Sequence, residues 1–195
     1  LKRVVCKFAC RGLGLKEEDI QGGHWDNMKL ANGTATSPIV LNLLDYLFWE
    51  ERKRKDTKFV FRERDSIEHF YPQDPKDFSE GERWKSNGNL NTIGNLCLIT
   101  RGENSWLSNN PPSRKVEMWH EREKKGEVVT APKQAEMYAV SPWTEEKCKE
   151  HDEMCRLLLI KFFEENGFPG PPSSPVASKD GPNTSGTGEN GSAGE

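Results

Sequence analysis

The chain has 195 residues, of which 33% are hydrophobic and 30% are charged, and its formal net charge is −3. That length suits one domain of ordinary size, and the slightly negative charge excludes a uniformly basic surface of the kind that coats nucleic acids. No stretch approaches the roughly 20 consecutive apolar residues of a membrane-spanning helix, so we expect no membrane partner.

The cysteines argue against a structural zinc site. Their number is odd, and no paired C-x-x-C motif occurs among Cys6, Cys10, Cys97, Cys148 and Cys155. Unpaired cysteines and the lack of an apolar signal segment are typical of a reduced protein, so we expect a cytoplasmic location.

The first 36 residues are rich in glycine and show no sustained hydrophobic periodicity. We predict a short strand or helix followed by loop, and treat residues 1–36 as an irregular N-terminal segment.

A helix is predicted to begin at Ser37-Pro38, because serine favours the N-cap position and proline the first helical position. Apolar residues then recur on one broad face, at Ile39, Val40, Leu43, Leu44, Leu47 and Phe48. A basic cluster follows directly, formed by Arg52, Lys53, Arg54, Lys55 and Lys58. Such a cluster suits either the negative end of the helix dipole or the phosphates of a nucleic acid, and we take it as a candidate nucleic-acid-binding surface.

Strand-like segments alternate with loops in the middle of the chain. Enrichment in β-branched and aromatic residues predicts strands over Lys58–Arg62, Ser66–Tyr71 and Thr92–Thr100. A short helix is predicted from Glu103 to Ser108, before a pair of prolines that would stop it. The order strand, loop, strand, helix predicts an α+β fold.

The C-terminal part is predicted to be largely helical. Residues 113–125 have the pattern of a charged helix, and residues 126–140 that of a connection with little regular structure. Capping residues and first-turn acids within Ser141–Glu146 predict a long helix that ends at Gly167. The remaining residues are rich in Pro, Gly, Ser and Thr, so we expect a domain over residues 37–168 and a disordered tail over 169–195.

Three polar residues of the α+β region have the chemistry of a reactive site. Glu68 and Asn104 offer oxygen ligands, which suit Mg²⁺ better than Zn²⁺, and His69 can act as an acid or a base. Each also has an ordinary structural interpretation, as do Asn95 at a turn and Lys115 on a solvated helix. Because neighbours on a strand point to opposite faces, Glu68 and His69 would share one site only at a twist, a bulge or a strand end.

The combined pattern resembles a known family. The matching residues are Ile67–Gln73, Trp84, Leu90–Ile99, Asn104, Leu107–Asn109, Lys115 and Trp143–Glu146. With them, the chain from about Ser37 to Gly167 resembles the HNH-like C-terminal domain of GmrSD-type modification-dependent restriction endonucleases, within the broader His-Me finger (ββα-metal) nucleases.

The resemblance implies a ββα-metal core, made of a short β-hairpin and a helix and flanked by further helices. It implies that His69 is the general base and that Glu68 and Asn104 hold one divalent ion, Mg²⁺ or Mn²⁺. Asn95 would support the histidine or the active-site loop, and Lys115 would make a phosphate or structural contact. The implied reaction is hydrolysis of DNA phosphodiester bonds, in restriction of foreign or modified DNA.

Two departures from the family pattern bear on these expectations. Cys148 and His151 stand where the last helix of the family commonly has an aliphatic residue and an arginine. The chain also lacks a Gly-rich phosphate-binding loop, so nucleotide hydrolysis would need a separate specificity subunit or domain. The alternative is a non-catalytic nucleic-acid-binding or accessory module with a degenerate nuclease site.

Overall fold

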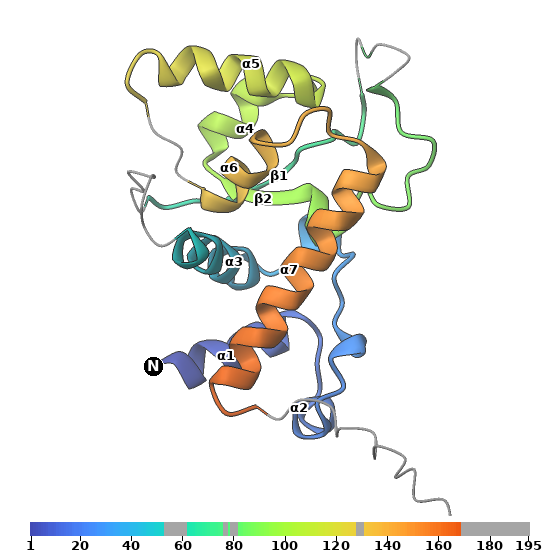
Figure 1. Ribbon diagram of the computed structural model, residues 1–195, viewed down its shortest axis with the longest axis vertical. Helices are drawn as coiled ribbons and strands as arrows, with labels where there is room; N and C mark the ends of the chain where they lie inside the picture. Colours follow the sequence, from blue (N-terminus) through green and yellow to red (C-terminus); the bar gives the residue numbers. More distant parts are fainter. Residues whose placement is uncertain (53–61, 76–77, 79–81, 128–130, 169–195) are drawn as a thin grey trace, which may run out of the picture.

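The computed structural model describes residues 1–52, 62–75, 78, 82–127 and 131–168. Over these residues the chain is α+β, with seven α-helices and a two-stranded antiparallel sheet (Figure 1). None of the helices in this part of the chain is long and apolar enough to cross a membrane. The basic residues Lys53, Arg54, Lys55 and Lys58, nearly all of the strand expected at Lys58–Arg62, and the tail over 169–195 lie outside the described residues.

The N-terminal segment begins with a helix, one of the two structures predicted there, and a second short helix lies in the part predicted to be loop. The segment contains α1 (Lys2–Gly12), α2 (Glu17–Gly22) and the short 3-10 turns η1 (Trp25–Asn27) and η2 (Gly33–Ala35). The buried stripe of α1 consists of the small residues Cys6, Ala9 and Cys10, whereas Val4 and Phe8 are each 52% exposed. The apolar residues of α1 recur four positions apart, as Val4 and Phe8, Val5 and Ala9, and Cys6 and Cys10, so the helix is amphipathic, although its largest apolar side chains stay partly exposed.

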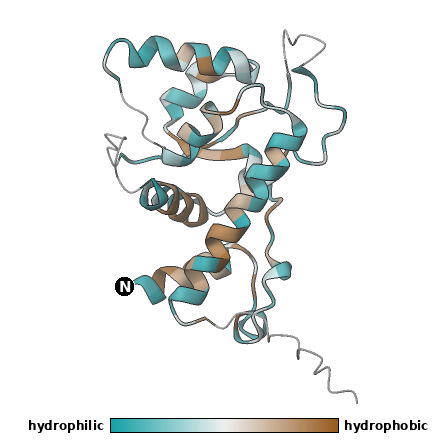
Figure 2. Cartoon of the chain, in the orientation of Figure 1, coloured by the Kyte–Doolittle hydropathy of each residue, from teal (hydrophilic) through white to brown (hydrophobic). Residues whose placement is uncertain are grey.

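Helix α3 (Pro38–Glu51) begins where the Ser-Pro pair predicts, and it buries the expected apolar face. It ends at Glu51, with Arg52 as its C-cap residue. Contacts of α3 with α1 and α7 build the first of two core clusters. Figure 2 shows hydrophobic residues concentrated on α3, on β2 and along the middle of α7.

The two strands, β1 (Ser66–His69) and β2 (Leu96–Ile99), are each shorter than the sequence pattern predicts. They pair antiparallel, with Glu68 opposite Cys97 and His69 opposite Leu96. Partners across an antiparallel ladder share a face, so the hairpin has two distinct sides. Leu96 and Leu98 belong to the first core cluster, and Cys97 and Ile99 to a second cluster that includes Trp119 and Tyr138.

The remaining helices are α4 (Arg101–Leu107), α5 (Pro112–Glu123), α6 (Pro132–Tyr138) and α7 (Glu145–Glu165). A capping box between Thr100 and Glu103 begins α4 two residues before the predicted start. Similarly, Thr144 caps α7, so that this helix begins after the Ser141-Pro142 pair.

Helix α6 corrects the expected irregular connection over residues 126–140. Its buried residues include Lys133 and Gln134, which occupy core-facing positions through hydrogen bonds. A helix whose buried face contains polar residues has a weak apolar periodicity, so the sequence pattern does not predict it.

Buried cations occupy the outer edges of the hairpin, where strand carbonyls have no partner strand. Lys133 Nζ donates to the carbonyl oxygen of Leu96 at 2.6 Å, and an Arg64 guanidinium nitrogen donates to that of Leu98 at 3.4 Å. On the β1 side, Lys115 Nζ donates to the carbonyl oxygen of His69 at 2.8 Å. Asp45 balances part of this charge, since it pairs with Arg64 and accepts the backbone N–H of Lys133.

Candidate functional site

His69 lies at the end of β1, on the face that β1 shares with Leu96. Its Nε2 atom is 3.0 Å from Asn91 Oδ1, and the residue is 7% exposed. Burial lowers the pKa of His69, an effect that the Asn91 hydrogen bond opposes and that the nearby charge of Lys115 reinforces. The imidazole is therefore neutral at pH 7, the form that can accept a proton.

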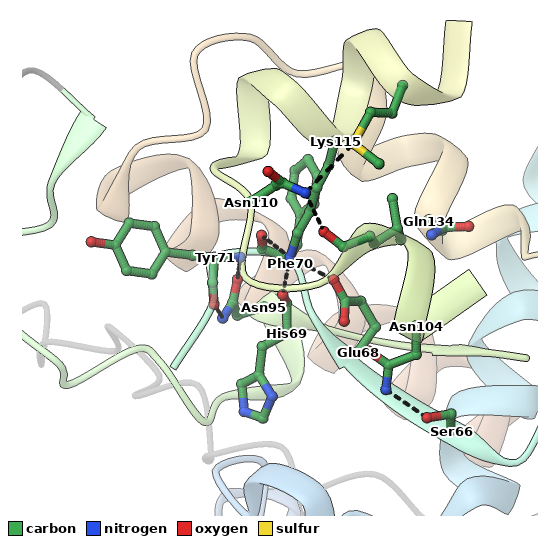
Figure 3. A network of polar contacts seen from close by, with 12 residues as sticks. Ser66, Glu68, His69, Phe70, Tyr71, Asn95, Asn104, Asn110, Lys115 and Gln134 are labelled. Carbon is green, nitrogen blue, oxygen red and sulfur yellow. Dashed lines mark hydrogen bonds and ion pairs between the residues drawn. The ribbon is translucent and has the colours of Figure 1, made fainter. Parts of the chain in front are cut away.

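Glu68 points to the opposite side of the hairpin, toward α5. Its Oε1 lies 2.5 Å from Lys115 Nζ, which also donates to the carbonyl oxygens of His69 and Phe70 at 2.8 and 3.1 Å (Figure 3). Burial raises the pKa of Glu68 and lowers that of Lys115, while the attraction between the two charges opposes both shifts. The pair thus fastens α5 to the end of β1.

The position of Lys115 corrects its expected contact with nucleic acid. Its side chain is 0% exposed, and three oxygen acceptors occupy its ammonium group. An ammonium group has three N–H donors, so none is left for a phosphate. Of its two expected roles, the geometry supports the structural one.

Asn104 lies on α4 and contacts the same side of β1 as Glu68. Its Nδ2 donates to Ser66 Oγ at 2.6 Å, and Ser66 shares a face with Glu68 because the two are separated by one residue of the strand. Figure 3 shows the His69 ring extending away from Lys115, on the other side. Because β1 stays extended and in register through both residues, Glu68 and Asn104 do not meet His69 at one position.

Asn95, in the 3-10 turn η4 (Ile93–Asn95), fixes the chain just after His69. Its Oδ1 accepts the backbone N–H of Tyr71 at 2.8 Å, and its Nδ2 donates to the carbonyl oxygens of Tyr71 and Leu90, both at 2.9 Å. The side chain is completely buried. Its partners are all backbone groups, which makes Asn95 a support for the loop instead of a reacting group.

Arg52 is the one member of the basic cluster that the described residues include. It forms an ion pair with Glu136 of α6, and both side chains are partly exposed. This ion pair links the end of α3 to α6. It also neutralises part of the positive charge of Arg52 that would attract a phosphate.

The expected ligands of a metal ion are the Glu68 carboxylate and the Asn104 amide oxygen. Over the described part of the chain, no group of three or more His, Cys, Asp or Glu side chains is arranged for metal binding. One carboxylate and one amide oxygen suit a hard cation such as Mg²⁺ or Mn²⁺, which keeps several water or phosphate ligands. The chemical types of these two donors therefore suit Mg²⁺ or Mn²⁺, although Lys115 already bonds to one oxygen of Glu68.

Two groups of supporting residues are not among the site residues that the sequence predicts. Asn91 contacts the His69 ring from a polar loop where an asparagine usually indicates a turn. On α7, Asp152 Oδ1 accepts the backbone N–H of Gly94 at 2.7 Å, and His151 Nδ1 lies 2.8 Å from the Gly94 carbonyl oxygen. Both depend on contacts between residues far apart in the sequence.

Fold and site together define an α+β domain with a buried, charge-stabilised β-hairpin that presents a neutral histidine. A family model described as the C-terminal domain of GmrSD restriction endonucleases matches residues 26–156, which include all the site residues above. The chain belongs to this family. Neither the curated proteins nor the solved structures contain a significant match to the chain.

Proposed function

We propose that this chain is a metal-dependent endonuclease domain that hydrolyses DNA phosphodiester bonds, in restriction of foreign or modified DNA. The observation that carries the proposal is His69, a neutral imidazole held by a hydrogen bond within the region that the restriction endonuclease family model matches. A neutral, oriented imidazole is suited to take a proton from water. In this proposal β1, β2 and α4 form an HNH-type ββα-metal core.

The polar residues around the hairpin divide into three roles. His69 accepts the proton of the attacking water. Glu68 and Asn104, which lie on the other side of β1 in this structure, would hold the divalent ion. When bound, that ion would stabilise negative charge on the phosphate. Asn95 and Lys115 keep the end of β1 in place through their backbone contacts. A separate specificity subunit or domain would supply nucleotide hydrolysis and recognition of modified bases.

Cleavage of modified and unmodified plasmid DNA, with Mg²⁺, with Mn²⁺ and with EDTA, tests this function. His69→Ala should lower the cleavage rate by roughly 100-fold or more, because a positioned general base contributes that much. The control is His120→Ala, which removes an exposed histidine of α5. Circular dichroism shows whether each variant is folded. Equal cleavage by folded His69→Ala and by wild type would refute the assignment.

The separation of the His69 ring from Glu68 and Asn104 favours a second candidate, a non-catalytic nucleic-acid-binding module. Such a module should bind DNA with an affinity that falls steeply as salt is raised, and should show no turnover with either metal. Gel-shift titrations at several salt concentrations, run beside the cleavage assay, distinguish the two candidates.

A further inference from the structure

The His69 ring has one hydrogen-bond partner among the described residues, the side-chain oxygen of Asn91. That oxygen lies 3.0 Å from Nε2 of His69 and 3.4 Å from Nε2 of Gln73. Two nitrogen groups therefore face the same oxygen atom. An amide oxygen accepts hydrogen bonds and never donates them, so a nitrogen that bonds to it must carry hydrogen.

This contact determines which nitrogen of the neutral imidazole is protonated. A neutral imidazole has one N–H and one lone pair. With the hydrogen on Nε2, facing Asn91, the lone pair resides on Nδ1. Nδ1 makes no hydrogen bond with any described residue, and its lone pair is the one that a proton from water would occupy.

Asn91 is itself held from the N-terminal segment. Its carbonyl oxygen accepts the backbone N–H of Gly33 at 3.0 Å. A Cβ atom at Gly33 would lie 2.8 Å from Asn91 Oδ1, and Gly33 has a positive φ of 53°, so a glycine there lets the amide approach. Nearby, the backbone N–H of Ile93 donates to the carbonyl oxygen of Leu30 at 2.6 Å. Backbone hydrogen bonds to the N-terminal segment therefore hold the loop that carries Asn91 in place, independently of the contact with His69.

We propose that Asn91 is a positioning residue that holds His69 in the Nε2–H tautomer, so that Nδ1 is the atom that accepts the proton of the attacking water. This inference rests on the proposed nuclease function for its role in catalysis. The contact between Asn91 and His69 can be tested without any activity.

Long-range ¹H–¹⁵N spectra of the full chain at about pH 8, where histidines are neutral, test the tautomer directly. The wild type should show His69 as Nε2–H, and the His69→Ala variant assigns its signals. His151 is an internal comparison, since its Nδ1 faces the Gly94 carbonyl oxygen and should carry the hydrogen. An Nδ1–H tautomer for His69 in the wild type would overturn the proposal.

Substitutions at Asn91 test its consequence for the reaction. Asn91→Ala should mix the His69 tautomers and lower kcat by roughly 10- to 100-fold, the usual effect of losing a group that orients a functional histidine, with KM for DNA unchanged. Asn91→Asp retains an acceptor oxygen and should restore the Nε2–H tautomer and most of kcat. The control is Asn89→Ala, which removes an asparagine of the same loop that bonds to Glu145 instead.

The outcomes separate this inference from the proposed function. Wild-type kcat and an unchanged tautomer in Asn91→Ala would overturn the positioning role while leaving the nuclease assignment intact. An inactive wild type would overturn the nuclease assignment and the catalytic part of this proposal. The spectra would then still decide whether Asn91 sets the tautomer.

Discussion

The Glu68–Lys115 pair combines two buried charges with two backbone contacts at the end of β1. Taking both charges out of water is costly, and their mutual attraction recovers that cost only while both are present. The pair is therefore more sensitive to loss of one partner than to loss of both.

Lys115→Met should lower the free energy of unfolding by about 3–5 kcal/mol, because it leaves the Glu68 carboxylate buried without its cation. Urea denaturation measures the change. The double variant Lys115→Met/Glu68→Leu should recover much of the loss, since it replaces the pair with apolar groups of similar size. Lys124→Met, an exposed lysine at the end of α5, is the control. A single variant within about 1 kcal/mol of wild type would contradict this account.

At the residue scale, the chemical types of the site could be predicted but not their arrangement. His69 next to Glu68, with Asn95 and Asn104 downstream, gives a pattern that the family resemblance identifies. The face of each residue follows from the register of β1 with β2, which a pattern within one strand does not contain. The burial of Lys115 depends on how α5 packs, and a lysine on a charged helix is usually exposed.

Among the elements, α7 determines where η4 and the start of β2 lie. Asp152 and His151 bond to the two backbone groups of Gly94, next to Asn95. A Cβ atom on Gly94 would lie 2.5 Å from the Cys148 carbonyl oxygen and 2.8 Å from the Asp152 nitrogen. These neighbours are backbone atoms of a helix, which cannot move aside easily.

Gly94→Ala should therefore destabilise the chain by about 1–3 kcal/mol, the usual cost of an added methyl group in a packed contact. Gly88→Ala is the matched control, because a Cβ there would have Ser86 Oγ at 3.5 Å as its nearest neighbour. Chemical denaturation of the two variants gives the comparison. Equal stability of Gly94→Ala and Gly88→Ala would show that α7 does not pack closely on η4.

Elements with a clear apolar face or strong caps could be predicted, and others could not. The stripe of α3, the caps of α7 and the two strands each have a local signal. Helix α6 lacks one, since polar side chains occupy part of its buried face, whereas α1 is amphipathic but only 11 residues long and followed by glycines. The stability of such helices comes more from tertiary packing than from the local preference of their residues.

On the scale of the whole molecule, the hairpin lies between two core clusters, and His151 connects them. Its ring stacks on Phe48 of the first cluster, with centroids 5.5 Å apart, and meets Trp143 of the second edge-on at 5.6 Å. Burial, reinforced by the charge of Lys133, lowers the pKa of His151 to about 3. The ring is thus neutral in the native state at all but strongly acidic pH.

His151 should make stability depend on pH between about 6.5 and about 3. In the unfolded chain a histidine takes up a proton near pH 6.5, whereas the native state takes it up near pH 3. Between these values the unfolded state binds more protons, so stability is full above pH 6.5 and falls with decreasing pH, by up to about 1.4 kcal/mol per pH unit.

His151→Gln removes this titration, so its stability should change less over that pH range. Urea denaturation at a series of pH values measures the two curves, with the exposed His24→Gln as control. Parallel curves for wild type and His151→Gln would contradict the effect.

The cations at the edges of the hairpin have a consequence for how molecules of this protein meet one another. An isolated pair of strands is normally unstable, and its open edges invite strands of other chains to add. Here Lys115, Lys133 and Arg64 donate to edge carbonyls from within the same chain. A strand from another molecule would have to displace these buried charges, so the hairpin is protected against edge-to-edge aggregation without a third strand.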